Sequence, residues 1–222
     1  MIVLDCDEAS GAVAREHLAP RKPTIAISCS VAEMTGVSDR LRRVGTVRSP
    51  QTLSEADRLL VAAWAADCAE RVLGLFEAEA PADDRPRAAI ARTRAFARGE
   101  LNTAEEIRRR FVGGRAAGDT KAPAAAAAAR AAGQAVAICH MGAHALGAAA
   151  YAVDAAGLAA PDRPEAVNNE IRWQLTHMST EVRAALRALP PLGENRSGPL
   201  GPGLLASGQL GTIIRHLQAG LT

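Results

Sequence analysis

The chain has 222 residues, of which 48% are hydrophobic but only 3% aromatic, and its 26 basic residues nearly balance 24 acidic ones. A core so poor in aromatic residues must be built from Ala, Leu, Val and Ile, which favours packed helices, and the length suits one domain with an appended segment. This composition predicts an all-α protein. The balanced charge argues against a nucleic-acid-binding surface, so we expect that the protein binds no nucleic acid.

Residues 1–48 differ in residue composition from the rest of the chain. Ile2–Leu4 and Thr24–Ser28 are short runs of β-type composition, which predict an irregular or β-type extension packing on a helical bundle. The acidic start argues against a signal peptide. With no persuasive membrane span in the sequence, we expect a cytoplasmic protein that does not enter a membrane.

Four cysteines are present, and none of them forms a CxxC motif. In a cytoplasmic protein this pattern predicts reduced, mostly buried thiols. A bridge between Cys6 and Cys29 stays open as an alternative. The cysteines are Cys6, Cys29, Cys68 and Cys139.

Residues 49–190 carry clear helix signals. Ser54 and Asp57 resemble a capping box, which predicts a long helix ending near Glu79. Its expected inward stripe at helical spacing is Leu53, Ala56, Leu60, Trp64, Cys68, Val72 and Leu75. Asp67 and Arg71 lie beside this stripe, either as an ion pair at the core boundary or as a partly buried pair that supports a pocket.

Two further helix starts follow. An acidic cap at Asp83 or Asp84 with Pro86 in the first turn predicts a helix that continues to about Leu101. Thr103 and Glu106 resemble a second capping box.

The stretch from Pro123 to Asp154 is alanine-rich, and we predict one central helix that closes near Gly157. It is apolar on nearly all sides, so it should be buried in the bundle. At 100° per residue one face of such a helix carries His140, His144, Gly147, Tyr151 and Asp154.

The rest of the chain predicts two helices and a tail. Val167–Met178 is amphipathic, with Trp173 and His177 on a neighbouring face, and Ser179 can cap a helix that ends at Pro190-Pro191. Residues 191–222 form a Gly/Pro-rich tail with a short helix as one option. Its last apolar residues either dock on the bundle or serve the second subunit of a homodimer; they are Ile213, Ile214 and Leu217.

His140 and His144 are the residues most suggestive of chemistry. Two histidines four residues apart on a helix can ligate a metal, but no third ligand lies nearby, so we expect no metal and no cofactor. A buried neutral pair hydrogen-bonded to Asp67, Asp84 or Asp154 fits better.

If these side chains converge on a cavity, the sequence predicts a proton-transfer site. His140, His144 and Asp67 would then be catalytic. The expected binding residues are Trp64, Arg71, Asp84, Arg85, Arg87, Tyr151, Asp154 and Trp173. Nothing in the sequence resembles a serine nucleophile elbow, a phosphate loop or a dinucleotide fingerprint. On a helix Cys139 points about 100° away from its neighbour His140, so His140 could not directly activate Cys139 as a nucleophile.

Four segments stand out as a set: AAWAADCAERVLGLFE (62–77), DDRPRAAI (83–90), the run 129–155 and EIRWQLTHMSTEVRAAL (170–186). Their most distinctive residues are Trp64, Asp67, Cys68, Glu70, Arg71, Asp84-Arg85-Pro86, His140, His144 and Trp173. On these residues the chain resembles, over about residues 55–190, a family of bacterial immunity proteins, the immunity-protein-five-like family. The resemblance implies a small intracellular helical protein that binds and neutralises a toxin.

The expected burial of these residues leaves a second function open. An immunity protein needs an exterior that fits its toxin, whereas an inward cluster of Trp, Asp, Arg and His suits a small-molecule pocket. The alternative is therefore an enzyme of secondary metabolism that uses acid/base or cyclisation chemistry, or a self-resistance protein that sequesters a small molecule.

Overall fold

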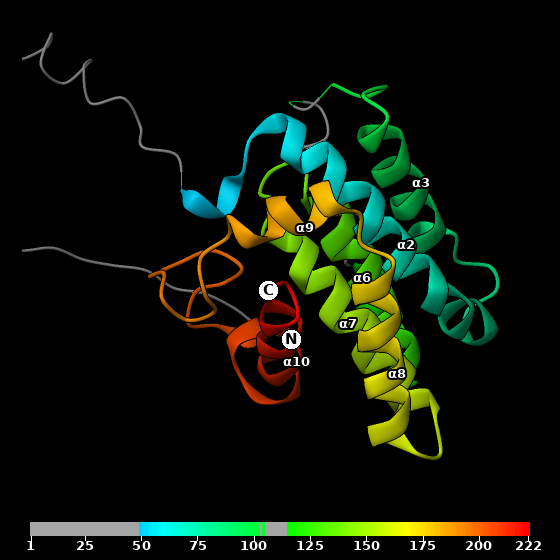
Figure 1. Ribbon diagram of the computed structural model, residues 1–222. Coiled ribbons are helices and arrows are strands. Elements are labelled where there is room, and N and C mark those ends of the chain that lie inside the picture. The colour runs from blue at the N-terminus through cyan, green and yellow to red at the C-terminus, as the bar shows by residue number, and fades with distance from the viewer. Residues whose placement is uncertain (1–48, 103, 105–114) are drawn as a thin grey trace, which may run out of the picture. The chain divides into compact units, whose positions relative to one another are not determined.

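Seven α-helices and three short 3-10 helices make up the described part of the chain (Figure 1). A computed structural model describes residues 49–102, 104 and 115–222, and no strand occurs within these ranges. The α-helices are α2 (Glu55–Glu79), α3 (Arg85–Ala97), α6 (Pro123–Ala137), α7 (His144–Ala159), α8 (Arg163–Thr176), α9 (Thr180–Arg187) and α10 (Gly208–Ala219). The 3-10 helices are η1 (Pro50–Thr52), η2 (Ala116–Gly118) and η3 (Leu204–Ala206).

Polar side chains begin the helices where the sequence predicts it. The Ser54 hydroxyl accepts a hydrogen bond from the Asp57 amide at 3.0 Å at the start of α2, and Ser179 accepts from the Val182 amide at 3.2 Å before α9. Each bond satisfies one of the amides that a helix start leaves unpaired. At α3 the Asp83 carboxylate accepts a hydrogen bond from the Arg85 amide at 3.1 Å, whereas the alternative cap, Asp84, makes no side-chain capping bond.

The core is built from alanine, as the composition predicts. Helix α7 packs against α2, α6 and α8, and α6 also packs against α2 and α3 (Figure 1). Helix α2 contributes Ala62, Ala65, Ala66 and Ala69, none of which is exposed to solvent. Side chains this small let helix axes approach closely, so the buried surface is extensive despite the scarcity of aromatics.

The prediction of one continuous central helix is wrong, because a turn at residues 138–143 divides it into α6 and α7. The Gly142 amide donates to the Thr52 carbonyl and the Ala143 amide to the Gln51 carbonyl, each at 3.0 Å. In a continuous helix these amides would donate to Ile138 and Cys139. Carbonyls of η1, far away in the sequence, replace the helical partners at this point.

Close packing of η1 enforces this turn. A Cβ atom on Gly142 would lie 2.5 Å from Cδ1 of Leu53, so only glycine fits. Leu53 itself has a φ of 60°, an unfavourable value for a residue with a branched side chain. Such strain persists only where surrounding contacts hold it, and the two amide bonds to η1 supply those contacts.

Gln51 joins η1 to the C-terminal part of the chain. Its side chain is 1% exposed. Its Nε2 donates to the Ser197 carbonyl at 2.7 Å, and its Oε1 accepts from the Leu200 amide at 2.9 Å. We call these two bonds the Gln51 clamp. The clamp fixes a Gly/Pro-rich segment that has little regular structure of its own.

The last helix, α10, packs against α7 and α8. Ile213, Ile214 and Leu217 are buried in that contact, so they dock on the bundle and do not form an outward surface for a second subunit. The predicted short helix in the C-terminal tail is therefore present. The C-terminal segment closes one side of the bundle (Figure 1).

Several predictions lie outside the described residues. They are the N-terminal extension, Cys6 and Cys29, and the capping box of Thr103 and Glu106. Cys68 and Cys139 are both buried. Among the described helices, none combines the length and the hydropathy that crossing a membrane requires.

Candidate functional site

The predicted site residues other than Asp154 lie at three places in the fold. Trp64, Asp67, Arg71 and Trp173 lie where α2 meets α8. His140, His144 and Tyr151 line a pocket beside the turn between α6 and α7. Asp84, Arg85 and Arg87 lie at the start of α3. The predicted meeting of Asp67 and Arg71 with the histidines is not seen, since the two groups line different pockets.

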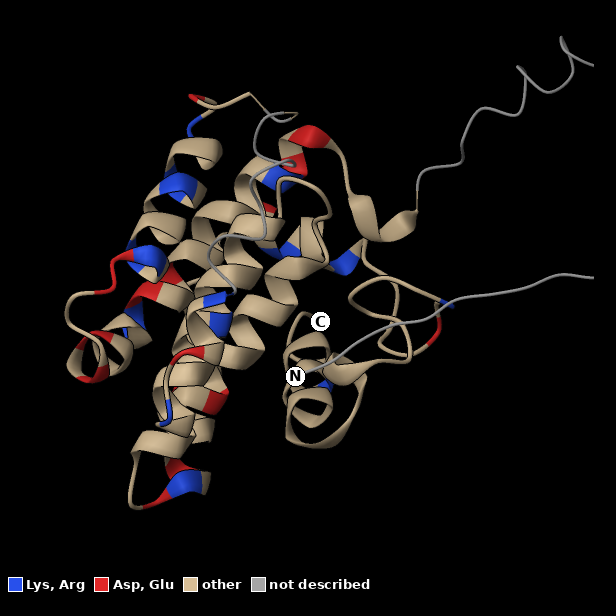
Figure 2. Ribbon diagram, turned by 180° about the vertical axis from the view of Figure 1, so that it is seen from behind, with Lys and Arg blue, Asp and Glu red and all other residues tan. Residues whose placement is uncertain are grey.

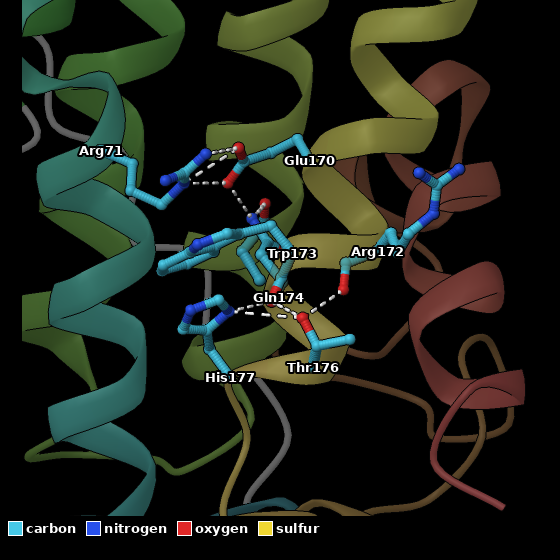
Figure 3. Close-up of polar contacts among 8 residues, drawn as sticks. Arg71, Glu170, Arg172, Trp173, Gln174, Thr176 and His177 are labelled. Carbon is cyan, nitrogen blue, oxygen red and sulfur yellow. Dashed lines mark hydrogen bonds and ion pairs between the residues drawn. The ribbon is translucent and has the colours of Figure 1, made fainter.

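Arg71 is the centre of the first of these places (Figure 3). Its guanidinium makes a bidentate bond to Glu170, with Nε donating to Oε1 at 3.1 Å and Nη2 to Oε2 at 3.0 Å. The same guanidinium lies over the Trp173 ring, 3.8 Å from its centroid, in cation–π geometry. Two partners on α8 thus hold one arginine from α2 in a fixed position.

A histidine completes this stack on the other side of the tryptophan (Figure 3). The rings of Trp173 and His177 are stacked with centroids 4.1 Å apart and planes inclined by 22°. Nδ1 of His177 lies 2.8 Å from the Trp173 carbonyl, which can only accept, so Nδ1 carries the proton. The result is an ordered stack of Arg71, Trp173 and His177.

Acidic side chains border the stack. Asp67 and Glu70 on α2 both pair with Arg94 of α3, and the Asp67 bond is 2.8 Å long. The carboxyl-bearing side chains of Asp67 and Glu70 are 50% and 52% exposed. The prediction that Asp67 and Arg71 lie inward is therefore wrong; the expected ion pair between them is replaced by pairs to Arg94 and Glu170.

We call Asp67, Glu70, Arg71, Trp173 and His177 the α2–α8 face. A depression of about 320 Å³ lies over these five residues. A wider groove of about 600 Å³ continues from Asp67 and His177, and Leu60 on its wall is 39% exposed. The other residues that line the groove are Ala56, Leu59, Ala63, Trp64, Ala97, Ser179 and Val182.

Buried polar residues behind the face hold it in place. Nε1 of Trp64 donates to the Gln174 carbonyl at 3.1 Å, and Nε2 of Gln174 donates to the Ala149 carbonyl at 3.2 Å and to Glu170 at 3.3 Å. Burial and the nearby Glu170 carboxylate raise the pKa of the Cys68 thiol well above its usual range. Cys68 therefore stays a neutral packing residue at physiological pH.

The sequence reasoning missed four residues of this region: Glu170, Gln174, His177 and Arg94. A signal for three of them exists, since Glu170, Trp173, Gln174 and His177 lie at spacings of three and four on one helix. Glu170 is only 5% exposed. A buried carboxylate needs a partner, and nothing in the local sequence points to Arg71.

The second place is a pocket of about 370 Å³, which we call the histidine pocket. It is lined by Gln134, His140, Met141, His144, Tyr151, Gly198, Pro199, Gly203, Leu204 and Leu205. Nδ1 of His144 lies 2.7 Å from Oε1 of Gln134. The C-terminal segment thus supplies one wall, and the α6–α7 turn with α7 supplies the other.

Tyr151 and Asp154 end up in different roles. Tyr151 lines the histidine pocket, and burial raises the pKa of its hydroxyl. Asp154 accepts a bond from Arg163 of α8 at 2.7 Å and does not line the pocket. Burial nevertheless raises the pKa of the Asp154 carboxyl.

Arginines at the third place take part in surface ion pairs. Arg85 bonds to Asp83 and, at 2.7 Å, to Asp119, while Arg87 bonds to Glu77. Charged residues of both signs lie side by side over the bundle helices, whereas the C-terminal segment carries few (Figure 2). Within residues 49–102, 104 and 115–222 there is no cluster of three or more His, Cys, Asp or Glu that could hold a metal ion.

Comparison with known proteins gives one match. The sequence profile of the family described as Imm-5 like putative immunity protein matches residues 51–181, which is more than half of the chain. No curated protein matches the sequence, and no solved structure does. The matched range contains all five residues of the α2–α8 face.

Proposed function

Because the chain belongs to the Imm-5 like putative immunity protein family, we propose that it binds and neutralises a protein toxin, which docks on the α2–α8 face. The observation that carries this proposal is the surface stack of Arg71, Trp173 and His177 beside an apolar groove. Tryptophan and arginine are enriched among the residues that dominate binding energy at protein interfaces.

The geometry of the stack favours tight binding. Arg71 is held by two bonds to Glu170, and Trp173 lies between Arg71 and His177. Side chains that are already ordered lose little conformational entropy when a partner binds. The face is therefore organised before the toxin arrives.

Charge at the edge of the face favours rapid association. Asp67 and Glu70 are about half exposed and, among the described residues, share a single partner, Arg94, so they form an acidic border of net negative charge at one edge of the stack. Such a border attracts a basic patch on a partner and speeds the encounter, an effect that weakens as salt concentration rises. The proposal includes the cytoplasmic location expected from the sequence.

The alternative of acid/base catalysis by His140, His144 and Asp67 has less support. Proton transfer requires that the acting groups lie within hydrogen-bond reach of one substrate. Asp67 lines the depression on the α2–α8 face, whereas both histidines line the histidine pocket. Toxin binding is the function that the geometry supports better.

Growth rescue tests the proposal. Each gene that neighbours the one encoding this chain is expressed alone and together with the chain, and the wild-type protein should restore growth against the product that is toxic. Arg71→Ala and Ala63→Glu, a change at an exposed position on the groove, should each lower the affinity for the purified toxin at least tenfold, about 1.4 kcal/mol. Arg98→Ala is the matched control, because it removes an exposed ion pair with Glu100 that does not belong to the face.

Two results would contradict the proposal. If both face variants rescue growth and bind the toxin as the wild type does, the toxin does not dock on this face. If the wild-type protein neither binds the toxin nor restores growth, the function itself is wrong. Unfolding midpoints measured for each variant separate loss of binding from loss of fold.

A further inference from the structure

We propose that the histidine pocket is a binding site for a small aromatic acid, a flat ring system that carries one carboxylate. The pocket is bounded by His140, His144 and Tyr151 on one side and by the segment from Gly198 to Leu205 on the other. This site is separate from the α2–α8 face, and the proposal does not depend on toxin binding.

Size is the first argument. The pocket has a volume of about 370 Å³. Small-molecule sites in proteins measure roughly 300–1,000 Å³, so this one lies near the lower end. It suits a ligand with one or two rings.

The lining combines apolar walls with converging polar groups. Met141, Pro199, Leu204 and Leu205 provide the apolar surface, and the imidazoles and the phenol provide flat faces against which a ring can pack. The polar atoms come from Gln134, His140, His144 and Tyr151. This combination of apolar surface with a few orienting polar groups is typical of ligand sites.

The charged groups around the pocket determine which charge a ligand should carry. Among the described residues that line the pocket, none is Asp or Glu. The Arg130 guanidinium lies 6.0 Å from the centroid of the Tyr151 ring, and the nearby Asp154 is already paired with Arg163. Since Tyr151 stays neutral and the imidazoles are neutral or positive, the field in the pocket favours an anion and disfavours a cation.

The pocket is held open by its own framework. Gln134 bonds to His144 and also packs against Gly147, where a Cβ atom would lie 2.5 Å from Oε1 of Gln134. On the other wall the Gln51 clamp fixes the backbone at Ser197 and Leu200. A preformed site avoids much of the ordering cost of binding.

Three naphthalene probes of matched size test the proposal in the full-length protein by calorimetric titration. They are 2-naphthoate, which is anionic, 2-naphthol, which is neutral, and 2-naphthylmethylammonium, which is cationic. We expect saturable one-to-one binding of 2-naphthoate and at least tenfold weaker binding of the ammonium probe. Equal affinity for the anionic and cationic probes, or no saturable binding of 2-naphthoate, would overturn the proposal.

Variants locate the binding. Gly203 lines the pocket and has open space where a Cβ atom would stand, so Gly203→Phe should fill the pocket and weaken 2-naphthoate binding at least tenfold. Gly118→Phe is the matched control, because Gly118 also has open space but does not line the pocket. If Gly203→Phe leaves the affinity unchanged while the protein stays folded, the probe binds elsewhere and the proposal fails.

Two variants at the rim that differ in charge but have nearly the same side-chain shape test the electrostatic argument. Leu204 lines the pocket and is 70% exposed. Leu204→Asp should weaken 2-naphthoate binding several-fold relative to the neutral Leu204→Asn, and the difference should shrink at high salt. Equal affinity in these two variants would refute the selection for an anion.

Discussion

Gln51→Ala is the substitution that most directly tests how the ends of the described chain are joined. It deletes both bonds of the Gln51 clamp. The Leu200 amide belongs to a fully buried residue, so it loses its partner without access to water, which costs about 1–3 kcal/mol. Ser197 is exposed and its carbonyl can turn to solvent, which adds only about 0.5–1.5 kcal/mol.

Together these losses predict that Gln51→Ala lowers the free energy of unfolding by about 1.5–4.5 kcal/mol. For a folded unit of this size the melting temperature should fall by roughly 3–18 °C. Urea unfolding followed by circular dichroism and by tryptophan fluorescence measures the change. Both probes should report a single transition that shifts to lower urea.

Gln218→Ala provides a matched control, because Gln218 makes the same two kinds of bond. Its Nε2 donates to the Pro190 carbonyl at 3.0 Å and its Oε1 accepts from the Leu192 amide at 3.1 Å. Gln218 and Leu192 are only half-buried, so water can replace the lost partners and the cost should be about 1 kcal/mol. Equal losses for the two variants, or a loss below about 0.5 kcal/mol for Gln51→Ala, would refute the reasoning.

Two other predictions concern the α6–α7 turn and a buried carboxyl. Gly142→Ala should destabilise the protein by about 1–3 kcal/mol in urea unfolding, because its new methyl group meets Leu53. Gly74→Ala, at a position in open space on α2, should instead stabilise the protein by about 0.5–1 kcal/mol. Similar effects at both sites would contradict this prediction. Burial raises the pKa of the Asp154 carboxyl above its ordinary value of 3.8, so the folded state binds a proton at Asp154 more tightly than the unfolded state does. The stability that this proton contributes is fully present below pH 3.8 and is lost as the pH rises through the raised pKa. Asp154→Asn, which resembles the protonated form, should therefore gain stability relative to the wild type between acidic and neutral buffer, and a constant difference would contradict it.

Local signals in the sequence were enough to predict most helices. Ser54 and Ser179 begin α2 and α9 as expected, because capping depends on atoms a few residues apart. The all-α class likewise follows from the scarcity of aromatics and the abundance of alanine. The break between α6 and α7 could not be predicted, since the carbonyls that replace its helical bonds come from Gln51 and Thr52.

The faces of α2 show a second limit. The predicted inward stripe contains Leu60, which is 39% exposed, and omits Ala62 and Ala66, which are fully buried. An alanine carries little hydrophobic signal, yet in this fold alanine faces form the tightest contacts. The periodicity of large side chains therefore misassigned part of the helix surface.

The candidate site was foreseen in its residue types more than in its arrangement. Asp67, Arg71 and Trp173 do lie together, but at the surface and without His140 and His144, while Trp64 is buried behind them. Their arrangement depends on Glu170 and Arg94, which come from other helices. Ion pairs between different helices cannot be recognised from the residue spacing within one helix.

Because α10 is buried against the bundle, the packed structure extends beyond the residues that the family profile matches. The family profile ends at residue 181, yet Ile214 and Leu217 are fully buried and Leu221, next to the last residue, is 3% exposed. A gene fragment cut at the family boundary would lose these side chains and leave apolar surface of α7 uncovered. Truncated or fused forms of this protein should therefore retain the chain through Leu221.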